Sequence, residues 1–509
     1  MTLHRPSPGA LRVAAALCLA MALPGTPARG ETLVDALIAA YGNSNLLEQN
    51  RALQRAADED VPQALAGLRP VLAFVANANH SWTEGALVRQ RDEEDNRTGP
   101  FTRNPGSATN ARSLGATLDL VLFDSGATRF SAEAAKETVK ATREALRQVE
   151  QQVLLEAVAA YMEVVRAGEF VALRESNVQL IEEELRAAED RFDVGAVTRT
   201  DVAIAESRLA GARAQLAAAQ GDLEVAREGY RASIGHYPGN LVRPVAPPRS
   251  PAATEEDAKD VARRSHPVIL QGRSQAAAAE ALVGRAKSAM KPRLSARATW
   301  THMQNLQRGN TDNSLQYLFR KAESTQDEKS ASLTLRAPIY SGGRLSAALR
   351  QAIARLDAAN AALRQDELNV GETVGRAWSN IVVAQASIVA GERQVEAAQI
   401  AFEGVREEAS LGARTTLDVL DAEQDLLDAR AGLIQAEIQR YVGMYSLMSS
   451  MGLMTAEHLN LGIETYDPAD YYDAVRRGPL RRVSPQGERL DLVLMRLYRR
   501  ERRDETPLQ

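Results

Sequence analysis

Four segments of the chain alternate apolar and polar residues, which is typical of a β-strand with two chemically different faces. In the clearest one, every second residue from Leu294 to Trp300 is apolar. The segments form two pairs, separated by polar loops at 83–110 and 303–329. The pattern therefore predicts two hairpins of strands, at residues 72–82, 113–122, 293–301 and 330–337.

The N-terminus has the features of a secretory signal peptide. An apolar run at 13–23 follows two arginines and leads into a small-x-small sequence at 28–30. The run is too short to cross a bilayer as a helix. Its cysteine, Cys18, follows a leucine instead of the small residue that a lipoprotein signal requires. We expect residues 1–30 to be removed on export, without a lipid anchor.

The length of the four segments suits a membrane better than a soluble hairpin with one wetted face. About ten residues are enough for a tilted strand to cross a bilayer. An open sheet of four strands would leave unpaired backbone groups in lipid, so several chains must close one barrel. Two chains would give eight strands around a filled interior, and three would give twelve strands with room for a channel. The polar inner face favours three chains.

Helical periodicity predicts very long helices at about 127–192 and 344–410. Each spans about 100 Å and is followed, after a tight turn, by a helix of about 35 residues. A helix of about 30 residues precedes each pair of strands and is broken by proline, at Pro62 and Pro70 or at Pro292. These lengths favour coiled-coil packing, and a plain soluble coiled coil is the alternative for the helices alone.

The chain is internally duplicated. Residues 195–202 (GAVTRTDV) are similar to 412–419 (GARTTLDV), and the same offset of 217 relates 123–126 to 340–343. A constant offset over separated segments indicates two structural repeats. Five prolines between the repeats predict a stiff, extended connector. The predicted regions are a signal peptide, a first repeat, a connector, a second repeat and a C-terminal extension, at 1–30, 31–236, 237–254, 255–454 and 455–509.

Composition narrows the classes of function. The 509 residues are 45% hydrophobic, 25% charged and 5% aromatic, which is the composition of a folded protein. A net charge of -5 argues against nucleic-acid binding. The six histidines are scattered, and the chain has neither H-E-x-x-H nor G-x-x-x-x-G-K-[ST]. We therefore expect no enzymatic activity, no cofactor and no metal. The arginine-rich end after residue 476 is interpreted as a solvated appendage, with contact to acidic partners as the alternative.

The duplicated turn between the helices holds the candidate functional residues. At each turn a glycine can end one helix in the left-handed conformation, and a threonine can cap the next. An aspartate three residues after the threonine would stabilise the N-terminus of that helix. These residues are Gly195, Thr198 and Asp201 in the first repeat, and Gly412, Thr415 and Asp418 in the second.

Capping does not explain Asp421, because the first repeat has Ile204 at the same position. Asp418 and Asp421 are three residues apart and share one helix face. In three chains they would form two rings of carboxylates, which attract cations and repel anions. A solvated acidic face is the alternative. Arg414 precedes Asp418 by four residues and can pair with acids of a neighbouring hairpin.

The two turns, VGAVTRTDV at 194–202 and LGARTTLDVLDAEQDL at 411–426, resemble the TolC family of outer-membrane channel proteins. The resemblance covers the chain from the predicted mature start to about residue 454. It implies a mainly α-helical trimer with four strands per chain. These would close a twelve-stranded β-barrel, continued by a twelve-helix periplasmic tunnel that is closed at its inner end.

The resemblance also implies roles for residues at the turns. Asp418 and Asp421 would form the cation-attracting constriction. Arg414 would hold the closed state by contacting Thr200 and Asp201 of a neighbouring chain. The TolC pattern has a tyrosine five residues before this arginine, whereas this chain has Ala409, so we expect one closing link to be missing. The glycines and threonines of the turns, Gly195, Thr198, Gly412 and Thr415, would contact the adaptor.

The pattern and the resemblance together predict a passive exit duct in the cell outer membrane. It would serve a tripartite efflux or type I secretion system and open by outward movement of the inner hairpins. The expected partners are two further copies of the chain, membrane lipid, a periplasmic adaptor (membrane fusion protein) and, through it, an inner-membrane transporter. The alternative is a periplasmic coiled-coil adaptor or structural protein, which would need one hairpin instead of two and no amphipathic strands. The sequence does not identify the cargo.

Overall fold

The computed structural model describes most of the chain from Gly30 to Arg476. The predicted signal peptide and the arginine-rich end lie outside the described residues. No helix among those described has the length and apolar character needed to cross a membrane. The described ranges are 30–83, 87–91, 98–103, 107–195, 197–244, 247–248, 252–309 and 321–476.

The chain divides into two compact units, which we describe separately. One, the strand unit, contains the strands and the helices next to them. The other, the hairpin unit, contains the helical hairpins that follow. Their segments are Arg51–Ala145, Val268–Glu367 and Asp467–Gln509 for the strand unit, and Met1–Asn50, Leu146–Pro267 and Leu368–Tyr466 for the hairpin unit.

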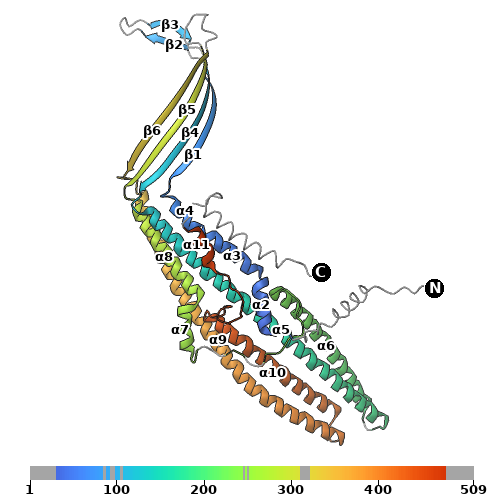
Figure 1. The fold of residues 1–509 in the computed structure, drawn as a ribbon. Helices are drawn as coiled ribbons and strands as arrows, with labels where there is room; N and C mark the ends of the chain where they lie inside the picture. The colour runs from blue at the N-terminus through green and yellow to red at the C-terminus, as the bar shows by residue number, and fades with distance from the viewer. Residues whose placement is uncertain are drawn as a thin grey trace, which may run out of the picture. The chain divides into compact units, whose positions relative to one another are not determined.

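The strand unit holds one antiparallel sheet with the order β1-β4-β5-β6 (Figure 1). The prediction of four strands in two pairs is confirmed, and β4 of the first repeat pairs with β5 of the second. Each strand extends beyond the alternating segment that predicted it, because backbone hydrogen bonds continue where both faces are polar. The strands are β1 (Val71–Thr83), β4 (Ser107–Phe123), β5 (Arg293–Gly309) and β6 (Lys321–Arg336).

The register separates the two faces of this sheet. One row across the four strands is Leu72, Leu118, Ala298 and Ala331, and the adjacent row is Ala73, Thr117, Thr299 and Ser330. Large apolar side chains of the first face are exposed in the single chain, including Leu72, Phe74, Leu118, Leu333 and Leu335. The sheet therefore has an apolar face and a polar face, as the alternation predicted.

Part of the predicted loop at 83–110 is structured. A short antiparallel hairpin, β2 (Leu87–Arg91) and β3 (Thr98–Arg103), forms a separate two-stranded sheet there. The residues around it carry no clear alternation, so the sequence pattern did not indicate it. The loop predicted at 303–329 is shortened by the extension of β5 and β6 from both sides.

The helix predicted before each pair of strands is divided into shorter helices. In the second repeat α7 (Glu255–Ser265) ends just before Pro267, where α8 (Pro267–Ser288) begins. A residue before proline is disfavoured in the helical conformation, which explains this division. Pro62 does not end a helix, contrary to the prediction: it lies in the first turn of α4, where a missing N–H costs little. The first repeat has α2 (Leu33–Asn43), α3 (Asn45–Asp58) and α4 (Asp60–Ala66).

The described part of the C-terminal extension contains one short helix, α11 (Pro468–Val475), in the strand unit. The Tyr471 hydroxyl donates a 2.8 Å hydrogen bond to Glu59. The Arg143 guanidinium lies 5.0 Å from the ring centroid of Tyr472, which is a cation–π contact. These contacts attach the beginning of the extension to α4 and α5.

The predicted long helices are confirmed. α5 (Ala127–Asp193) and α9 (Arg344–Ser410) each contain 67 residues. α6 (Arg199–Ile234) follows α5, and α10 (Thr416–Ser450) follows α9, so each repeat ends in a helical hairpin (Figure 1). We call α5/α6 the first hairpin and α9/α10 the second hairpin.

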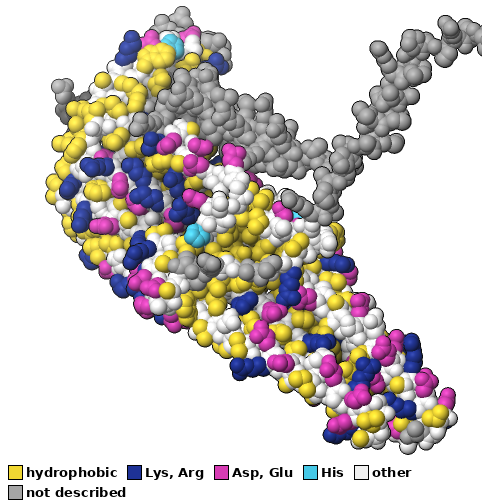
Figure 2. Space-filling model, turned by 60° about the horizontal axis from the view of Figure 1, so that its bottom comes forward, with side chains coloured by type: hydrophobic (Ala, Val, Ile, Leu, Met, Phe, Trp, Pro, Cys, Tyr) yellow, Lys and Arg dark blue, Asp and Glu magenta, His cyan; other side chains and the backbone are white. Residues whose placement is uncertain are grey.

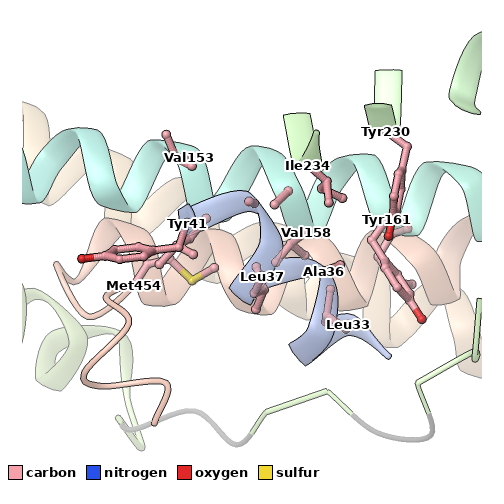
Figure 3. Close-up of a cluster of buried hydrophobic side chains, with 14 of the residues drawn as sticks. Leu33, Ala36, Leu37, Tyr41, Val153, Val158, Tyr161, Tyr230, Ile234 and Met454 are labelled. Atoms are coloured by element: carbon pink, nitrogen blue, oxygen red, sulfur yellow. The ribbon is translucent and has the colours of Figure 1, made fainter. Parts of the chain in front are cut away.

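The main core of the hairpin unit lies where α2 packs against the first hairpin (Figure 3). Leu33 and Leu37 of α2 lie beside Val158, Tyr161 and the fully buried Tyr230. The Tyr161 hydroxyl lies 2.6 Å from the carbonyl oxygen of Val242 and 2.9 Å from that of Glu31. Burial raises the pKa of Tyr161 to about 12, so the hydroxyl stays a donor. This core ties the start of α2 and the connector to the first hairpin.

Candidate functional site at the hairpin tips

The two hairpin tips have the same backbone geometry. Gly195 and Gly412 have φ angles of 75° and 78°, in the left-handed region that favours glycine. Thr198 and Thr415 then cap α6 and α10, each within a reciprocal capping box. In the second tip, the Thr415 N–H donates to the Asp418 carboxylate at 2.9 Å, and the Asp418 N–H donates to the Thr415 hydroxyl at 3.2 Å. The duplicated sequence thus forms a duplicated turn.

These caps also fix the charge of the two aspartates. Hydrogen bonds from the backbone and side chain of Thr198 lower the pKa of Asp201. The same bonds from Thr415 lower the pKa of Asp418. Both side chains are therefore ionised at neutral pH.

Asp421 is not part of a cap. Its Oδ1 atom lies 2.8 Å from Nη2 of Arg208, which is on α6 of the first hairpin. Both side chains are about half exposed, so the pair lies in solvent and joins the two hairpins at the surface. Sequence analysis did not identify Arg208, because neither its position nor its repeat counterpart, Asp425, suggests a partner for Asp421.

Arg414 binds within its own hairpin in the single chain. Its Nε atom donates a 2.9 Å hydrogen bond to Glu408, which lies near the C-terminus of α9. Asp201, one predicted partner of Arg414 in a neighbouring chain, accepts hydrogen bonds from Thr198 here. The structure does not bring Arg414 together with Thr200 or Asp201 of the same chain.

Ala409 lies inside the second hairpin, at 5% exposure. It belongs to a small apolar cluster with Phe402, Val419 and Leu426. A methyl group at this position fills the interface between α9 and α10 and provides no hydroxyl for a contact outside the hairpin. The structure thus shows what occupies the place of the tyrosine of the TolC pattern.

A buried polar cluster also joins the two hairpins. The Asn177 side-chain amide on α5 donates a 2.5 Å hydrogen bond to Glu423 Oε1 on α10. Beside them, Arg406 Nε on α9 lies 3.0 Å from Glu184 Oε1 on α5. Glu423 is only 5% exposed, and its second carboxylate oxygen is buried without a hydrogen-bond partner among the described residues.

The burial of Glu423 changes its acidity. The pKa of Glu423 is raised to about 7, mainly by desolvation. The hydrogen bond from Asn177 and the charge of Arg406 oppose this rise, and the nearby Glu184 carboxylate adds to it. Sequence analysis missed this residue, although a signal was present. Glu423 lies one turn from Val419, Leu420, Leu426 and Leu427, which are all buried, so helical periodicity places it on the apolar face of α10.

Away from this cluster, the surface of the hairpins is of mixed charge. Figure 2 shows positive and negative side chains interspersed on the ends of the hairpins, with scattered apolar side chains between them. The most exposed large apolar side chains at the tips are Val194 and Leu411, at 80% and 79% exposure. They occupy equivalent positions in the two repeats. Each tip thus presents one apolar side chain beside a glycine and a cap.

The described chain combines a four-stranded sheet that has one apolar face with two long helical hairpins, which is the architecture that the resemblance to outer-membrane channels implies. The profile of the family "Outer membrane efflux protein" matches residues 37–236 and 260–453, which lie within the two predicted repeats. The outer membrane efflux protein BepC of Brucella suis is 35% identical over 466 residues, covering 92% of this chain and 95% of BepC. The chain therefore belongs to the outer membrane efflux protein family.

More distant relatives agree with this assignment. Outer membrane protein TolC of Escherichia coli is 24% identical over 421 residues, covering 81% of this chain and 80% of TolC. The crystal structure of the outer membrane protein VceC of Vibrio cholerae superposes with a TM-score of 0.66 at 21% identity. That superposition covers 82% of this chain and 96% of VceC. The resemblance to the TolC family is confirmed.

Membership of this family establishes where the protein is located and which class of protein it belongs to. The protein is an outer-membrane protein of a family of transport channels. The alternative of a periplasmic adaptor with one hairpin is wrong, because the chain has two hairpins and a four-stranded sheet, and both repeats match the channel family.

Proposed function

We propose that three copies of this chain form a passive exit duct that conducts substrates across the outer membrane. The observation that carries this proposal is the open sheet. Within the described residues β1 and β6 each pair on one side only, so a row of backbone N–H and C=O groups is unpaired at both edges. In lipid each unpaired group would cost several kcal/mol, on the order of 4. Pairing β6 of one chain with β1 of the next would close a barrel and satisfy these groups.

The number of chains follows from the faces of the sheet. Three chains give a twelve-stranded barrel, whose interior is wider than side chains can fill. The row of Ala73, Thr117, Thr299 and Ser330, which is polar in three of the four strands, would face this interior, and the exposed leucines would face lipid. The six hairpins of three chains would then form a twelve-helix tunnel in the periplasm.

The tunnel would be closed at the hairpin tips and opened by outward movement of the second hairpin. Three polar contacts between described residues would resist this movement in each chain. They are Arg208 with Asp421, Arg406 with Glu184, and Asn177 with Glu423. Arg414 would add a contact to Thr200 and Asp201 of a neighbouring chain, in exchange for its bond to Glu408.

The narrowest part would be lined by Asp418 and Asp421. Asp418 is held ionised by its cap, so three chains would present a ring of fixed negative charge. Such a ring attracts cations and repels anions. Asp421 lies one helical turn farther along α10 and would form a second ring.

The energy for transport would come from a partner, because the sequence contains no nucleotide-binding loop. We propose a periplasmic adaptor that docks on the tips and links the duct to an inner-membrane transporter. The exposed side chains of Val194 and Leu411, next to Gly195 and Gly412, support a contact there. The transporter would select the cargo, whether a drug, a toxin or a protein.

Mass and conductance test this proposal together. Protein extracted in detergent should have the mass of a trimer by light scattering, after subtraction of the detergent. The same material should form channels of low conductance in planar bilayers. A folded, strictly monomeric protein, or one that remains in the aqueous phase, would contradict the proposed duct.

A further inference from the structure

The two carboxylates proposed for the constriction have different surroundings. Asp418 accepts hydrogen bonds from its own cap at Thr415. Asp421 instead forms an ion pair with Arg208 at 2.8 Å. The other nearby cation, Arg414, directs its guanidinium to Glu408. One of the two acids thus forms an ion pair with a basic side chain, whereas the other is bound by its own cap and is influenced by Arg414 only through its charge.

The basic partner comes from the other repeat. Arg208 lies on α6 of the first hairpin, and Asp421 lies on α10 of the second. The first repeat has Ile204 where the second has Asp421, so it adds no carboxylate at this level and brings a guanidinium instead. The charge of the site therefore depends on both hairpins, although both acids belong to the second.

From this geometry we infer that Arg208 is a selectivity-determining residue of the channel, which cancels the charge of Asp421 and leaves Asp418 to attract cations. This inference rests on the proposed function, in which the tips of three chains surround one pore. Two carboxylates and one guanidinium leave a single net negative charge per chain. That is half the charge that the two acids alone would provide.

Removal of the guanidinium should make the constriction more negative. With Arg208→Gln, three chains would carry three additional uncompensated charges close to the pore axis. Salt screens charges over about 8 Å at physiological ionic strength, so charges within that distance of a permeating ion would act on it. We expect the half-blocking concentration of the trivalent cation La³⁺ to fall about tenfold. The cation-to-anion permeability ratio, measured from reversal potentials in a KCl gradient, should rise.

A double variant separates charge from a loosened contact. Arg208→Gln combined with Asp421→Asn removes both members of the pair and leaves the net charge of the site unchanged. Its permeability ratio and La³⁺ block should return to those of the unmodified channel. If the double variant keeps the altered selectivity of Arg208→Gln, the effect comes from broken packing and the inference is overturned.

Arg213→Gln is the matched control, because Arg213 lies on the same helix and forms a 2.8 Å ion pair with Glu182 within the first hairpin. It should leave selectivity and block unchanged, and an equal change in this variant would show that the effect is not specific to Arg208. Asp421→Asn alone should lower cation selectivity. If it does so while Arg208→Gln has no effect, only the inference about Arg208 fails. If neither this variant nor Asp418→Asn changes selectivity, the proposed constriction itself is wrong.

Discussion

The first and second hairpins share one backbone plan and differ in where they place their acids. Both have a 67-residue helix, a left-handed glycine at the tip and a capping box. The second hairpin adds Asp421 at the surface and Glu423 in the interface between hairpins. The first has Ile204 and the exposed Glu206 at the same positions. Duplication thus preserved the turn, whereas the side chains just beyond it differ between the two hairpins.

The largest expected effect tests whether the acids that attract cations belong to the second hairpin alone. Asp418→Asn with Asp421→Asn should lower the cation-to-anion permeability ratio about tenfold or more, because both proposed rings lose their charge. Asp201→Asn in the first hairpin is the matched control and should change the ratio little. Reversal potentials in planar bilayers measure both. Equal effects from the two hairpins would remove the functional distinction between them.

The next effect concerns the contact proposed to hold the tip closed. Arg414→Ala should raise the conductance of the closed channel several-fold, since each chain would lose one charge-assisted hydrogen bond and exposed contacts of this kind are weak. The corresponding residue of the first tip is Val197, and Val197→Ala should leave the closed conductance unchanged. An unaltered leak in Arg414→Ala would exclude this arginine from closure.

A smaller effect depends on pH. Glu423 is buried between the hairpins with a pKa of about 7, and solvation on opening would return the pKa toward its ordinary 4.5. The closed state therefore binds the proton more tightly. The stabilisation of the closed state by this proton is fully present below pH 4.5 and is lost as the pH rises through about 7. We expect the leak conductance to increase between about pH 5 and pH 8.

Two variants assign this pH dependence to one side chain. Glu423→Gln should keep the low leak of acidic solution across the whole range, because the amide cannot ionise. Glu206→Gln, at the equivalent exposed position of the first repeat, should retain the pH dependence of the unmodified channel. Glu184 and Arg406 face Glu423 from α5 and α9, so Arg406→Gln should shift the midpoint upward. A pH profile that is unchanged in Glu423→Gln would refute the assignment.

The smallest expected effect tests the shared part of the two tips. Thr198→Ala and Thr415→Ala each remove a helix cap, which costs about 1 kcal/mol of stability. The two losses should be similar, because both capping boxes have the same geometry. The rate of limited proteolysis at the tips measures these losses of stability. The Thr→Ser variants, which keep the capping hydroxyl, are the reference. A clearly larger loss at one tip would show that its threonine has a second role.

Local patterns predicted much of the fold. Strand alternation placed all four strands of the main sheet, and the long helices begin and end within one residue of the expected positions. The proline connector and the boundaries of the five regions remain predictions. The sequence pattern missed the β2/β3 hairpin, whose strands pair without a clear alternation of side chains. It also predicted a helix break at Pro62, which lies inside α4.

The sequence predicted the caps of the candidate site but not its contacts between hairpins. The caps at Thr198 and Thr415 depend on residues three apart, so spacing alone predicts them. The pairs of Arg208 with Asp421 and of Asn177 with Glu423 join residues 213 and 246 positions apart. No periodicity within one helix contains that information.

The sequence by itself determined the duplicated plan, the two-faced strands and the capped turns, because each depends on interactions between residues close in the chain or repeated at a constant offset. Tertiary structure decided which acids are paired, buried or left to solvent. Those properties depend on which side chain of the neighbouring helix packs against each acid. That side chain lies hundreds of positions away in the sequence. Asp418 and Asp421 look equivalent three residues apart on one helix, yet one is held by its own cap and the other by an arginine of the first hairpin.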